Sequence, residues 1–390
     1  MNACWPLAVL AVIVTAILLA NRQPALQPIF RWLPVPLWCY ALPMAATTAG
    51  WLPGQHAAYR LVTTQFLPFA LALLLLGVDL PAVMRSGGRA LVAAVIGAAG
   101  IVVGAPLGLW VLQSRLPPEA WKGAGTLAGT WTGGTMNLLA LRSILGTPEP
   151  IFASLIIVDA MVAYSWMALL VAASGFQPVV NRWLRVPASN DSETHPNPNL
   201  ACGQTPSLSG TRATFLCAII SFALALSAHL LGARLPASPL VSSSTGWIVL
   251  LVTTAALGLS LIPPIRRLGA SGERLGYLSL YLVLAATGAQ ARPEALWSAP
   301  AWIALGAVIV LVHGGMLLLA GRLLRIPLGT LATASQANIG GVVSAPLVGA
   351  VYHHSLVPVG LLLAIAGNAL GTYLGLLSAT LCRWLLNAGS

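Results

Sequence analysis

The stretch GTWTGGTMN, residues 129–137, lies inside a long apolar segment, although its composition is poor for a regular membrane helix. Glycine costs about 1 kcal/mol in a helix interior, and this stretch combines three glycines with three threonines and an asparagine. In hydrocarbon an unpaired backbone group is so costly that irregular chain must be buried in protein or line a wet cavity. The stretch therefore predicts a broken helix beside a polar site.

A second stretch of this kind is SQANIGGVVSAP, residues 335–346, in which Pro346 also disfavours a continuous helix. Close helix packing through small residues is the alternative interpretation of such glycines. We prefer that alternative for Gly367, Gly371 and Gly375, which recur at every fourth position. For the two Gly-Gly stretches we predict discontinuous helices, because each pair lies beside amide or hydroxyl side chains.

The composition of the whole chain is that of a polytopic membrane protein. Hydrophobic residues make up 58% of its 390 residues and charged residues 7%, whereas roughly a quarter of a soluble protein is charged. We expect an all-α fold with eleven to thirteen transmembrane helices, because apolar runs near the ~20 residues needed to cross a bilayer recur. The predicted spans are 4–20, 35–52, 61–78, 90–113, 121–145, 150–175, 213–233, 245–262, 274–290, 299–321, 329–350 and 356–386.

The net charge of +11 does not indicate a nucleic-acid partner. The 19 Lys and Arg residues lie singly or in pairs at the ends of apolar spans, where such residues set topology and contact lipid headgroups. The five cysteines show no spacing typical of a metal site. The expected partners are the lipid bilayer and a small-molecule or ion substrate. We expect no cofactor, and a homodimer is compatible with the sequence.

The polar segment 176–212 divides the chain into two parts, 1–175 and 213–390, that resemble each other. Pro, Asn, Ser and Thr dominate this segment, so we expect an exposed linker without a membrane span. Each part contains a Gly-Gly stretch followed, at nearly the same separation, by a polar residue in an apolar span: Asp159 in the first part and Asn368 in the second. This correspondence predicts an internal structural repeat.

The basic residues predict the orientation of the chain in the membrane. Most Arg residues of the second part fall on one side, which places the C-terminus in the cytoplasm, whereas Arg22 and Arg31 after the first span favour an external N-terminus. These two assignments need an odd number of crossings, but the predicted spans number twelve. The residues alone therefore leave both parallel and inverted repeats open.

The two predicted breaks would leave half-helix ends facing each other near the bilayer midplane. Helix N-termini attract anions, and exposed carbonyls at C-termini attract cations. Neutral oxygens and amides from the same stretches would line the resulting cavity, with Ser344 among them. The predicted substrate- or ion-binding residues are Thr130, Thr132, Gly133, Gly134, Thr135, Asn137, Ser335, Gln336, Asn338, Gly340, Gly341 and His313.

Asp159 is the acidic residue that lies well inside an apolar span, ASLIIVDAMVAYSWMALL. A charge at such depth costs ~2.5–3.5 kcal/mol on insertion scales, so we expect a carboxylate that binds Na⁺ or carries a proton, with Asn368 as a neutral partner. The alternative is a protonated, structural carboxyl bonded to Tyr164, Ser165 or a neighbouring helix. For His313 the alternative is a buried histidine with satisfied hydrogen bonds.

These motifs resemble a known family. GTWTGGTMNLLAL, LLLLGVDLPAVMRSGGRAL, ASQANIGGVVSAP, LVHGGMLLLAGRLLRIPL and SLVPVGLLLAIAGNALGTYLG are similar to the bacterial integral membrane family called domain of unknown function 819. The resemblance covers nearly the whole chain except 176–212. The family is grouped with the cation/proton antiporter and bile-acid symporter superfamily, which implies inverted repeats with crossed, broken helices.

The sequence departs from the family pattern in three places. Asp159-Ala160 stands where the family often has Asp-Asn, Thr135-Met136-Asn137 where it has Ser-Val-Asn, and Gly340-Gly341-Val342 where it has Gly-Gly-Pro. Without the neighbouring Asn, a proton is more expected at Asp159 than Na⁺.

A secondary active transporter combines these features: it moves a small solute by alternating access, coupled to Na⁺ or H⁺. We expect a multi-pass protein of the bacterial cytoplasmic membrane. The alternatives are a passive channel, a regulatory membrane protein and an intramembrane enzyme. We do not expect an enzyme, because the sequence shows no paired nucleophile and base, no paired Asp residues and no HExxH.

Overall fold

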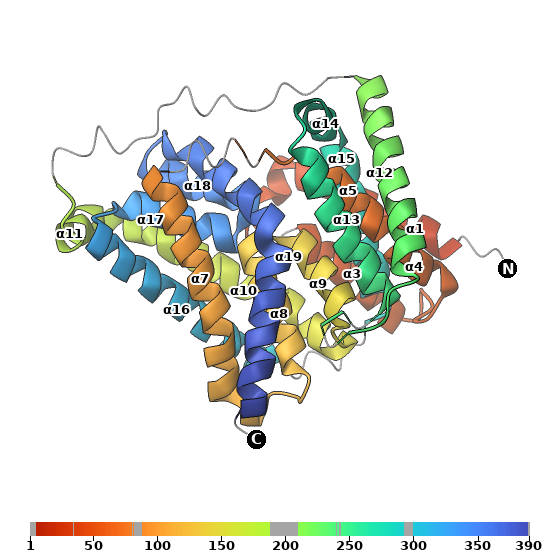
Figure 1. Cartoon of the computed structure of the whole chain (residues 1–390), viewed down its shortest axis with the longest axis horizontal. Coiled ribbons are helices and arrows are strands. Elements are labelled where there is room, and N and C mark those ends of the chain that lie inside the picture. Colours follow the sequence, from red (N-terminus) through yellow and green to blue (C-terminus); the bar gives the residue numbers. More distant parts are fainter. Residues whose placement is uncertain are drawn as a thin grey trace. The chain divides into compact units, whose positions relative to one another are not determined.

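The computed structural model describes residues 5–33, 35–79, 81, 88–187, 210–238, 240–241, 243–291 and 299–388. Within these ranges the chain forms helices and no strand, which confirms the all-α prediction (Figure 1). Seven of the described helices are long and apolar enough to cross a membrane. A bent pair, Ser244–Ser260 with Pro263–Gly288, meets at 117° and can serve as an eighth span. The protein is therefore a multi-span membrane protein.

Each predicted span overlaps helix, but the seven or eight described helices that could cross a membrane are fewer than the eleven to thirteen predicted. Two of the predicted spans are divided in the middle. α8 (Ala120–Gly133) and α9 (Thr135–Leu145) share the predicted span 121–145. α17 (Leu328–Ile339) and α18 (Gly341–Tyr352) share the predicted span 329–350. The prediction of two broken helices is therefore confirmed, and each half-helix is too short to cross the hydrocarbon alone.

The chain divides into two compact units, each built from segments that are distant in the sequence. Unit 1 comprises Met1–Gly77, Arg142–Ala160 and Ser207–Trp302. Unit 2 comprises Val78–Leu141, Met161–Pro206 and Ile303–Ser390. Each unit thus takes residues from both sides of the predicted linker, and the repeat relationship between the two halves of the sequence stays a prediction.

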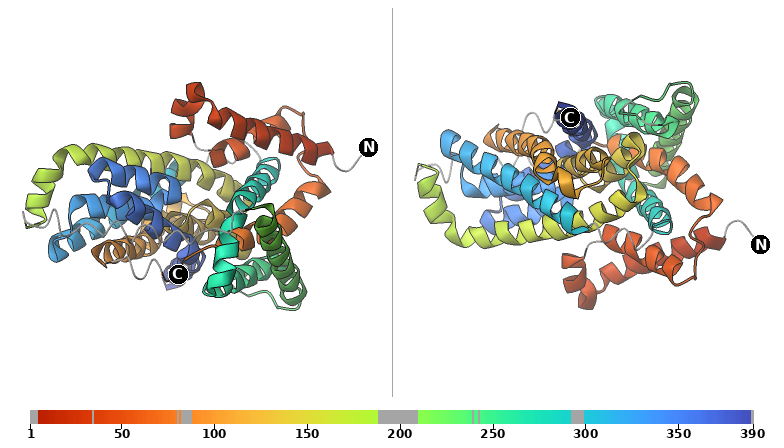
Figure 2. Two further views of the ribbon diagram at one scale, coloured as in Figure 1. Left: turned by 90° about the horizontal axis from the view of Figure 1, so that it is seen from above. Right: turned by 90° about the horizontal axis from the view of Figure 1, so that it is seen from below.

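The first residues of the predicted linker 176–212 are helical rather than irregular. α10 (Glu149–Ala173) passes through the 3-10 turn η4 (Ser174–Phe176) into α11 (Gln177–Trp183), as Figure 2 shows in yellow-green. Pro178 can start α11 because the first turn of a helix needs no N–H donor at that position. Residues 188–209 of the linker lie outside the described ranges.

Unit 1 is organised around α15, which packs against α3 and α5, and α12 and α13 cover the other side of α5. α1 buries Leu10, Val14 and Ile17 on one face and packs against α3 and α15. α4 and α5 are joined by a π-helical turn, η2 (Val62–Phe66). The helices are α1 (Trp5–Arg22), α2 (Gln27–Trp32), α3 (Val35–Thr48), α4 (Ala57–Leu61), α5 (Leu67–Leu75), α12 (Thr211–Gly232), α13 (Ser244–Ser260), α14 (Pro263–Gly269) and α15 (Glu273–Gly288), with the 3-10 turns η1 (Pro24–Leu26) and η7 (Ala270–Gly272).

Unit 2 is organised around α19 (Leu356–Ala388), which packs against α7, α8, α17 and α18 (Figure 1). α7 spans Gly88–Leu112 and ends in the 3-10 turn η3 (Gln113–Arg115). α9, α10 and α16 (Ala299–Leu324) each contribute residues to both units.

The pairing of α8 with α19 depends on glycine in both helices. A Cβ at Gly125 would lie 2.9 Å from Cα of Ala379, and one at Gly129 would lie 2.8 Å from the carbonyl oxygen of Gly371. The contact continues to the last residue of α8. This arrangement confirms the packing interpretation of the glycines in α19 and shows that α8 supplies the matching stripe, which permits close backbone approach.

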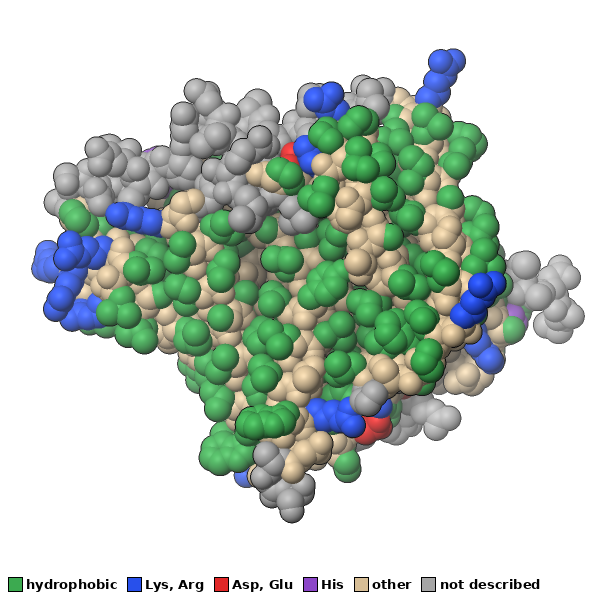
Figure 3. Space-filling model, in the orientation of Figure 1, with side chains coloured by type: hydrophobic (Ala, Val, Ile, Leu, Met, Phe, Trp, Pro, Cys, Tyr) green, Lys and Arg blue, Asp and Glu red, His purple; other side chains and the backbone are tan. Residues whose placement is uncertain are grey.

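Exposed apolar side chains follow one face of α12, where Phe215, Ile219, Phe222, Leu226 and Leu230 are each close to half exposed or more. An apolar stripe of this kind needs hydrocarbon or protein against it. In Figure 3 hydrophobic side chains cover much of the visible face, and the blue Lys and Arg side chains lie near its margins. These surfaces are those expected of a lipid-embedded protein.

Candidate functional site

α8 stops at Gly133 because Gly134 takes a backbone conformation that residues with a side chain rarely adopt. Gly134 has φ +75° and ψ −179°, in a region essentially restricted to glycine. Its N–H still donates to the carbonyl oxygen of Thr130 at 2.5 Å, and α9 starts at the next residue. The two adjacent glycines therefore have different roles, since Gly134 makes the break and Gly133 packs against α19.

Asn137 ties this break to α19. Its Nδ2 donates to the carbonyl oxygen of Gly133 at 2.5 Å and to that of Asn368 at 3.1 Å. Its Oδ1 accepts a hydrogen bond from the hydroxyl of Thr372 at 2.5 Å. Asn137 is buried, so both ends of its carboxamide are used within the protein, and the first break is closed by its own side chains.

The threonines of the first stretch point their hydroxyls back along their own helix. Thr130 Oγ1 donates to the carbonyl oxygen of Thr126 at 2.7 Å, and Thr132 Oγ1 donates to that of Ala128 at 3.0 Å. Thr135, at the start of α9, is partly exposed. Bonds of this kind let a hydroxyl sit in an apolar helix, so the first two residues have a structural use.

The second break lies between α17 and α18. Gly341 has φ +70°, and Gly340 precedes it with φ −105° and ψ −10°. The carboxamide of Gln336 occupies the space beside Gly340, where a Cβ would overlap both Gln336 Nε2 and Ser344 Oγ. Gln336 Nε2 donates to Ser344 Oγ at 2.8 Å. This bond joins the last turn of α17 to the first turn of α18.

Gln336 Oε1, in contrast, is buried and has no hydrogen-bond partner among the described residues. The whole side chain is 1% exposed. A buried acceptor without a partner is rare in native proteins and calls for an explanation such as a bound ion or water.

The ends of α8 and α17 meet the same point of α19. A Cβ at Gly367 would clash with the carbonyl oxygen of Thr132 and would lie 3.9 Å from that of Ala337. Asn368 Oδ1 would lie 3.1 Å from a Cβ on Gly134. Both approaching ends are helix C-termini, whose carbonyls carry partial negative charge. This part of unit 2 therefore favours a cation over an anion.

His313 lies next to the second break, on α16, and has hydrogen bonds on both ring nitrogens. Nδ1 is 2.8 Å from the carbonyl oxygen of Gly97 and Nε2 is 2.7 Å from Ser335 Oγ. A carbonyl only accepts, so Nδ1 carries the proton and Nε2 accepts from Ser335 in the neutral ring. Trp166 Nε1 also donates to Ser335 Oγ at 2.8 Å. This geometry is that of the buried, satisfied histidine.

Asn338 also contacts α7, since its Nδ2 donates to the carbonyl oxygen of Ala94 at 2.9 Å. A Cβ at Gly97 would clash with Nδ2 of Asn338 at 2.5 Å and with Cε1 of His313 at 2.8 Å. The polar side chains of α17 thus divide into two groups. Ser335 and Asn338 hold the helix against its neighbours, and Gln336 presents an unused acceptor.

Asp159 is partly buried on the segment of α10 that belongs to unit 1, whereas Asn368 and the residues of both breaks belong to unit 2. Asp159 has an interaction partner, so its carboxyl is not free. The coupling role and the structural role both stay predictions for this residue.

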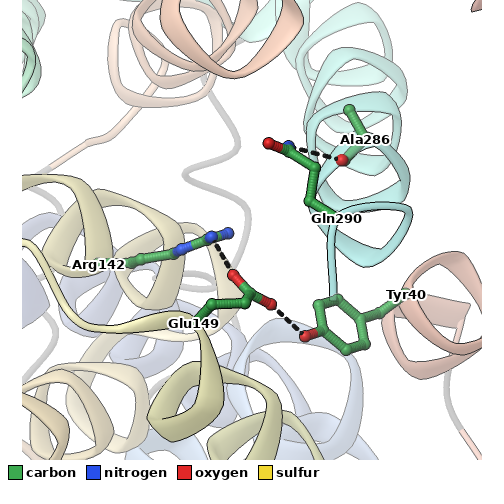
Figure 4. A network of polar contacts seen from close by, with 5 residues as sticks. All are labelled: Tyr40, Arg142, Glu149, Ala286 and Gln290. Carbon is green, nitrogen blue, oxygen red and sulfur yellow. Dashed lines mark hydrogen bonds and ion pairs between the residues drawn. The ribbon is translucent and has the colours of Figure 1, made fainter. Parts of the chain in front are cut away.

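A second polar cluster lies in unit 1 and joins α3 to the turn between α9 and α10 (Figure 4). Arg142 forms an ion pair with Glu149 Oε2, and Tyr40 donates to Glu149 Oε1 at 2.8 Å. The guanidinium of Arg142 lies 4.3 Å from the ring centroid of Phe152. Gln290, drawn in the same view, lies in the turn after α15 and donates to the carbonyl oxygen of Ala286 in that helix at 2.9 Å. The cluster is internally paired and fixes the turn.

Sequence reasoning missed several of these partners. Thr372 lies one turn after Asn368 on α19, so helical spacing from a predicted site residue could have identified it. No sequence pattern indicated Trp166 or Tyr40, because their hydrogen-bond partners, Ser335 and Glu149, are distant in the sequence. Among the described residues no three of His, Cys, Asp or Glu gather as a metal site.

Two comparisons with known proteins agree with this membrane architecture. The family model described as "Protein of unknown function (DUF819)" matches residues 8–385, and the chain belongs to that family. The chain is also similar to the uncharacterized membrane protein YjcL of Bacillus subtilis (strain 168), with 24% identity over 349 residues. This match covers 85% of the chain and 86% of YjcL.

Proposed function

We propose that this protein is a secondary active transporter that moves a small solute by alternating access and couples the movement to Na⁺ or H⁺. The observation that supports the proposal best is the approach of two broken-helix ends, at Thr132 and Ala337, to one point of α19. A regular helix keeps its carbonyls paired, and a chain gives up that pairing inside a bilayer chiefly to bind ions or solutes.

Within this proposal the residues divide by role. The carboxamides at the two breaks and the helix ends beside Gly367 form the binding region, and Asp159 is the coupling carboxylate because it lies well inside the membrane span Glu149–Trp183. A bound ion or solute shifts the equilibrium between inward- and outward-open states only if it binds one state more tightly. The neutral groups at the breaks supply binding, and a titratable group supplies proton linkage.

The proposal extends to the arrangement in the cell. The resemblance to antiporters supports inverted repeats, and the arginine distribution supports a cytoplasmic C-terminus. We place the protein in the bacterial cytoplasmic membrane. Membership of the DUF819 family is consistent with this topology and leaves the solute open.

The test is transport by purified protein in liposomes. Imposed Na⁺ and pH gradients would be applied, and radioactive Na⁺ uptake and internal pH would be followed with and without a small-molecule extract of bacterial cells. We expect ion flux in the wild type, lost in Asp159→Asn and kept in Glu119→Gln, whose carboxylate is exposed and paired with Lys122. Flux retained by Asp159→Asn removes the coupling role, and no ion flux in the wild type under either gradient contradicts the transporter.

One observation favours an intramembrane enzyme as a second candidate. The fold brings a serine hydroxyl and an imidazole, Ser335 and His313, to 2.7 Å, a nucleophile–base pair that sequence reasoning did not find. Both side chains are at most 1% exposed, and the Trp166 indole already donates to the serine oxygen. A nucleophile needs a free lone pair and a path for the substrate, so we rank this candidate second.

A further inference from the structure

The two helix breaks differ in how their carboxamides are used. At the first break both the Nδ2 amide and the Oδ1 oxygen of Asn137 form hydrogen bonds to protein groups. At the second break Gln336 Nε2 donates a hydrogen bond to Ser344, whereas Gln336 Oε1 is buried and has no partner among the described residues. The breaks are therefore unequal, and only the second has an acceptor reserved for a group outside the described residues.

The surroundings of Gln336 Oε1 define the chemistry of that group. The acceptor lies on the last turn of α17, where the helix dipole is negative and favours positive charge. In unit 2 the described acidic residues are Asp79 and Glu119, and neither is on a broken helix or on α19. The described residues of the broken helices include no carboxylate, and their neutral oxygens suit a monovalent hard cation better than a divalent one.

A proton does not fit this position. A carboxamide does not titrate in the physiological range, and both ring nitrogens of the neighbouring His313 already have hydrogen-bond partners in Gly97 and Ser335. The oxygen groups that the break does supply are Gln336 Oε1, Ser344 Oγ and the last carbonyls of α17. Oxygen is the element that alkali cations prefer as a ligand.

We propose that the break between α17 and α18 is a sodium site in which Gln336 Oε1 is a ligand. The assignment rests on the proposed transporter function and deepens it, because it names Na⁺ as an ion bound at this break and makes Gln336 its ligand, while Asp159 remains the proposed coupling carboxylate. The absence of Asn after Asp159 bears on sodium at Asp159 only, so it does not conflict with a site on Gln336.

Gly340 contributes to the same proposed site. Its missing side chain leaves the space that the Gln336 carboxamide fills, and any Cβ there would overlap Nε2 and Ser344 Oγ. A glycine at this position therefore leaves room for the hydrogen bond from Gln336 Nε2 to Ser344 Oγ across the break.

The experiment measures melting temperature in detergent as NaCl replaces choline chloride at constant ionic strength. Ligand that binds the folded state raises the melting temperature with its concentration. We expect a Na⁺-dependent rise in the wild type and a loss of roughly tenfold or more in apparent Na⁺ affinity in Gln336→Leu. Gln290→Leu is the matched control, since Gln290 is in unit 1 and its amide donates to Ala286 of the preceding helix α15, and it should respond like the wild type.

Gln336→Glu keeps the site testable if Gln336→Leu does not fold. A carboxylate only accepts hydrogen bonds and attracts cations, so we expect Na⁺ to stabilise this variant at lower concentration than the wild type. In the opposite orientation of the Gln336 carboxamide, the unpaired atom would be Nε2. The site would then bind a hydrogen-bond acceptor rather than a cation. Equal or weaker Na⁺ response in Gln336→Glu, or an unchanged response in Gln336→Leu, would overturn the sodium assignment.

The outcome separates this inference from the proposed function. Asp159→Asn should keep the Na⁺-dependent rise, because the site does not include Asp159. A wild type that shows no Na⁺ response but carries protons in liposomes overturns the sodium site and leaves the transporter standing. Na⁺ binding without ion flux supports the site and contradicts the transporter.

Discussion

Gly133 of α8 lies against Gly367 of α19 so closely that a Cβ on Gly133 would be 2.5 Å from the carbonyl oxygen of Gly367. This contact brings the last turn of α8 to the position where α17 also ends. The close packing of the two glycine stripes and the break that follows at Gly134 are therefore parts of one arrangement. Packing through small residues and a broken helix were alternatives at the level of sequence, and both occur here in adjacent residues.

Replacing Gly133 by alanine should separate α8 from α19. We expect Gly133→Ala to destabilise the protein by about 1–3 kcal/mol, the usual range for overpacking, and to lower the melting temperature in detergent. Gly315→Ala on α16 is the matched control, because a Cβ at Gly315 meets no atom within 4 Å. That control should be neutral or stabilising by up to ~1 kcal/mol. Equal melting temperatures for the two variants would contradict the packing.

Thr372→Val removes the hydroxyl that donates to Asn137 Oδ1 without changing the size of the side chain. The oxygen of Asn137 is then buried without a partner, which costs about 1–3 kcal/mol. We expect a lower melting temperature and faster hydrogen exchange at the start of α9. Thr380→Val serves for comparison, because the exposed hydroxyl of Thr380 bonds only its own helix. An unchanged exchange rate at α9 would show that Asn137 does not hold the break.

Ser335 should not react as an enzymatic nucleophile. We expect no covalent labelling by a fluorophosphonate probe in intact protein, because Trp166 donates to the serine oxygen and the site is closed. Trp166→Phe removes that donor and is the variant in which weak labelling could begin, with Ser335→Ala as its background. Labelling of the wild type that disappears in Ser335→Ala would promote the intramembrane enzyme above the transporter.

Glu149→Gln breaks the ion pair with Arg142 and weakens the acceptor for Tyr40. The two charged side chains are 23% and 25% exposed, so solvent screening is partial, and we expect a loss of about 1–3 kcal/mol in stability. Glu119→Gln is the contrasting case, because its carboxylate is 51% exposed and exposed pairs contribute ~0.2–1 kcal/mol. Thermal melts of both variants at low and high salt give the comparison, and similar losses would show that the cluster does not fix the turn.

Much of the fold could be predicted because helix length and polarity are local properties. Each predicted span overlaps helix, although the described helices long enough to cross a membrane number seven or eight rather than the eleven to thirteen predicted. Both Gly-Gly stretches mark real breaks, since Gly134 and Gly341 need a positive φ. The turn into α11 was predicted as irregular linker, because Pro and Asn are frequent there, but Pro178 starts a helix. The grouping of segments into units could not be predicted, because contacts between distant helices leave no periodic signal in either helix.

By itself the sequence determined that this chain is helical, embedded in a membrane and broken at two glycine pairs, because those properties follow from hydropathy and from backbone freedom at single residues. Only the tertiary structure decided how the polar side chains are used. Asn137, Ser335 and Asn338 form hydrogen bonds to neighbouring helices, whereas Gln336 has a buried oxygen without a partner among the described residues. The reason is that a hydrogen bond depends on where two groups meet in space, and residue type alone does not fix that position.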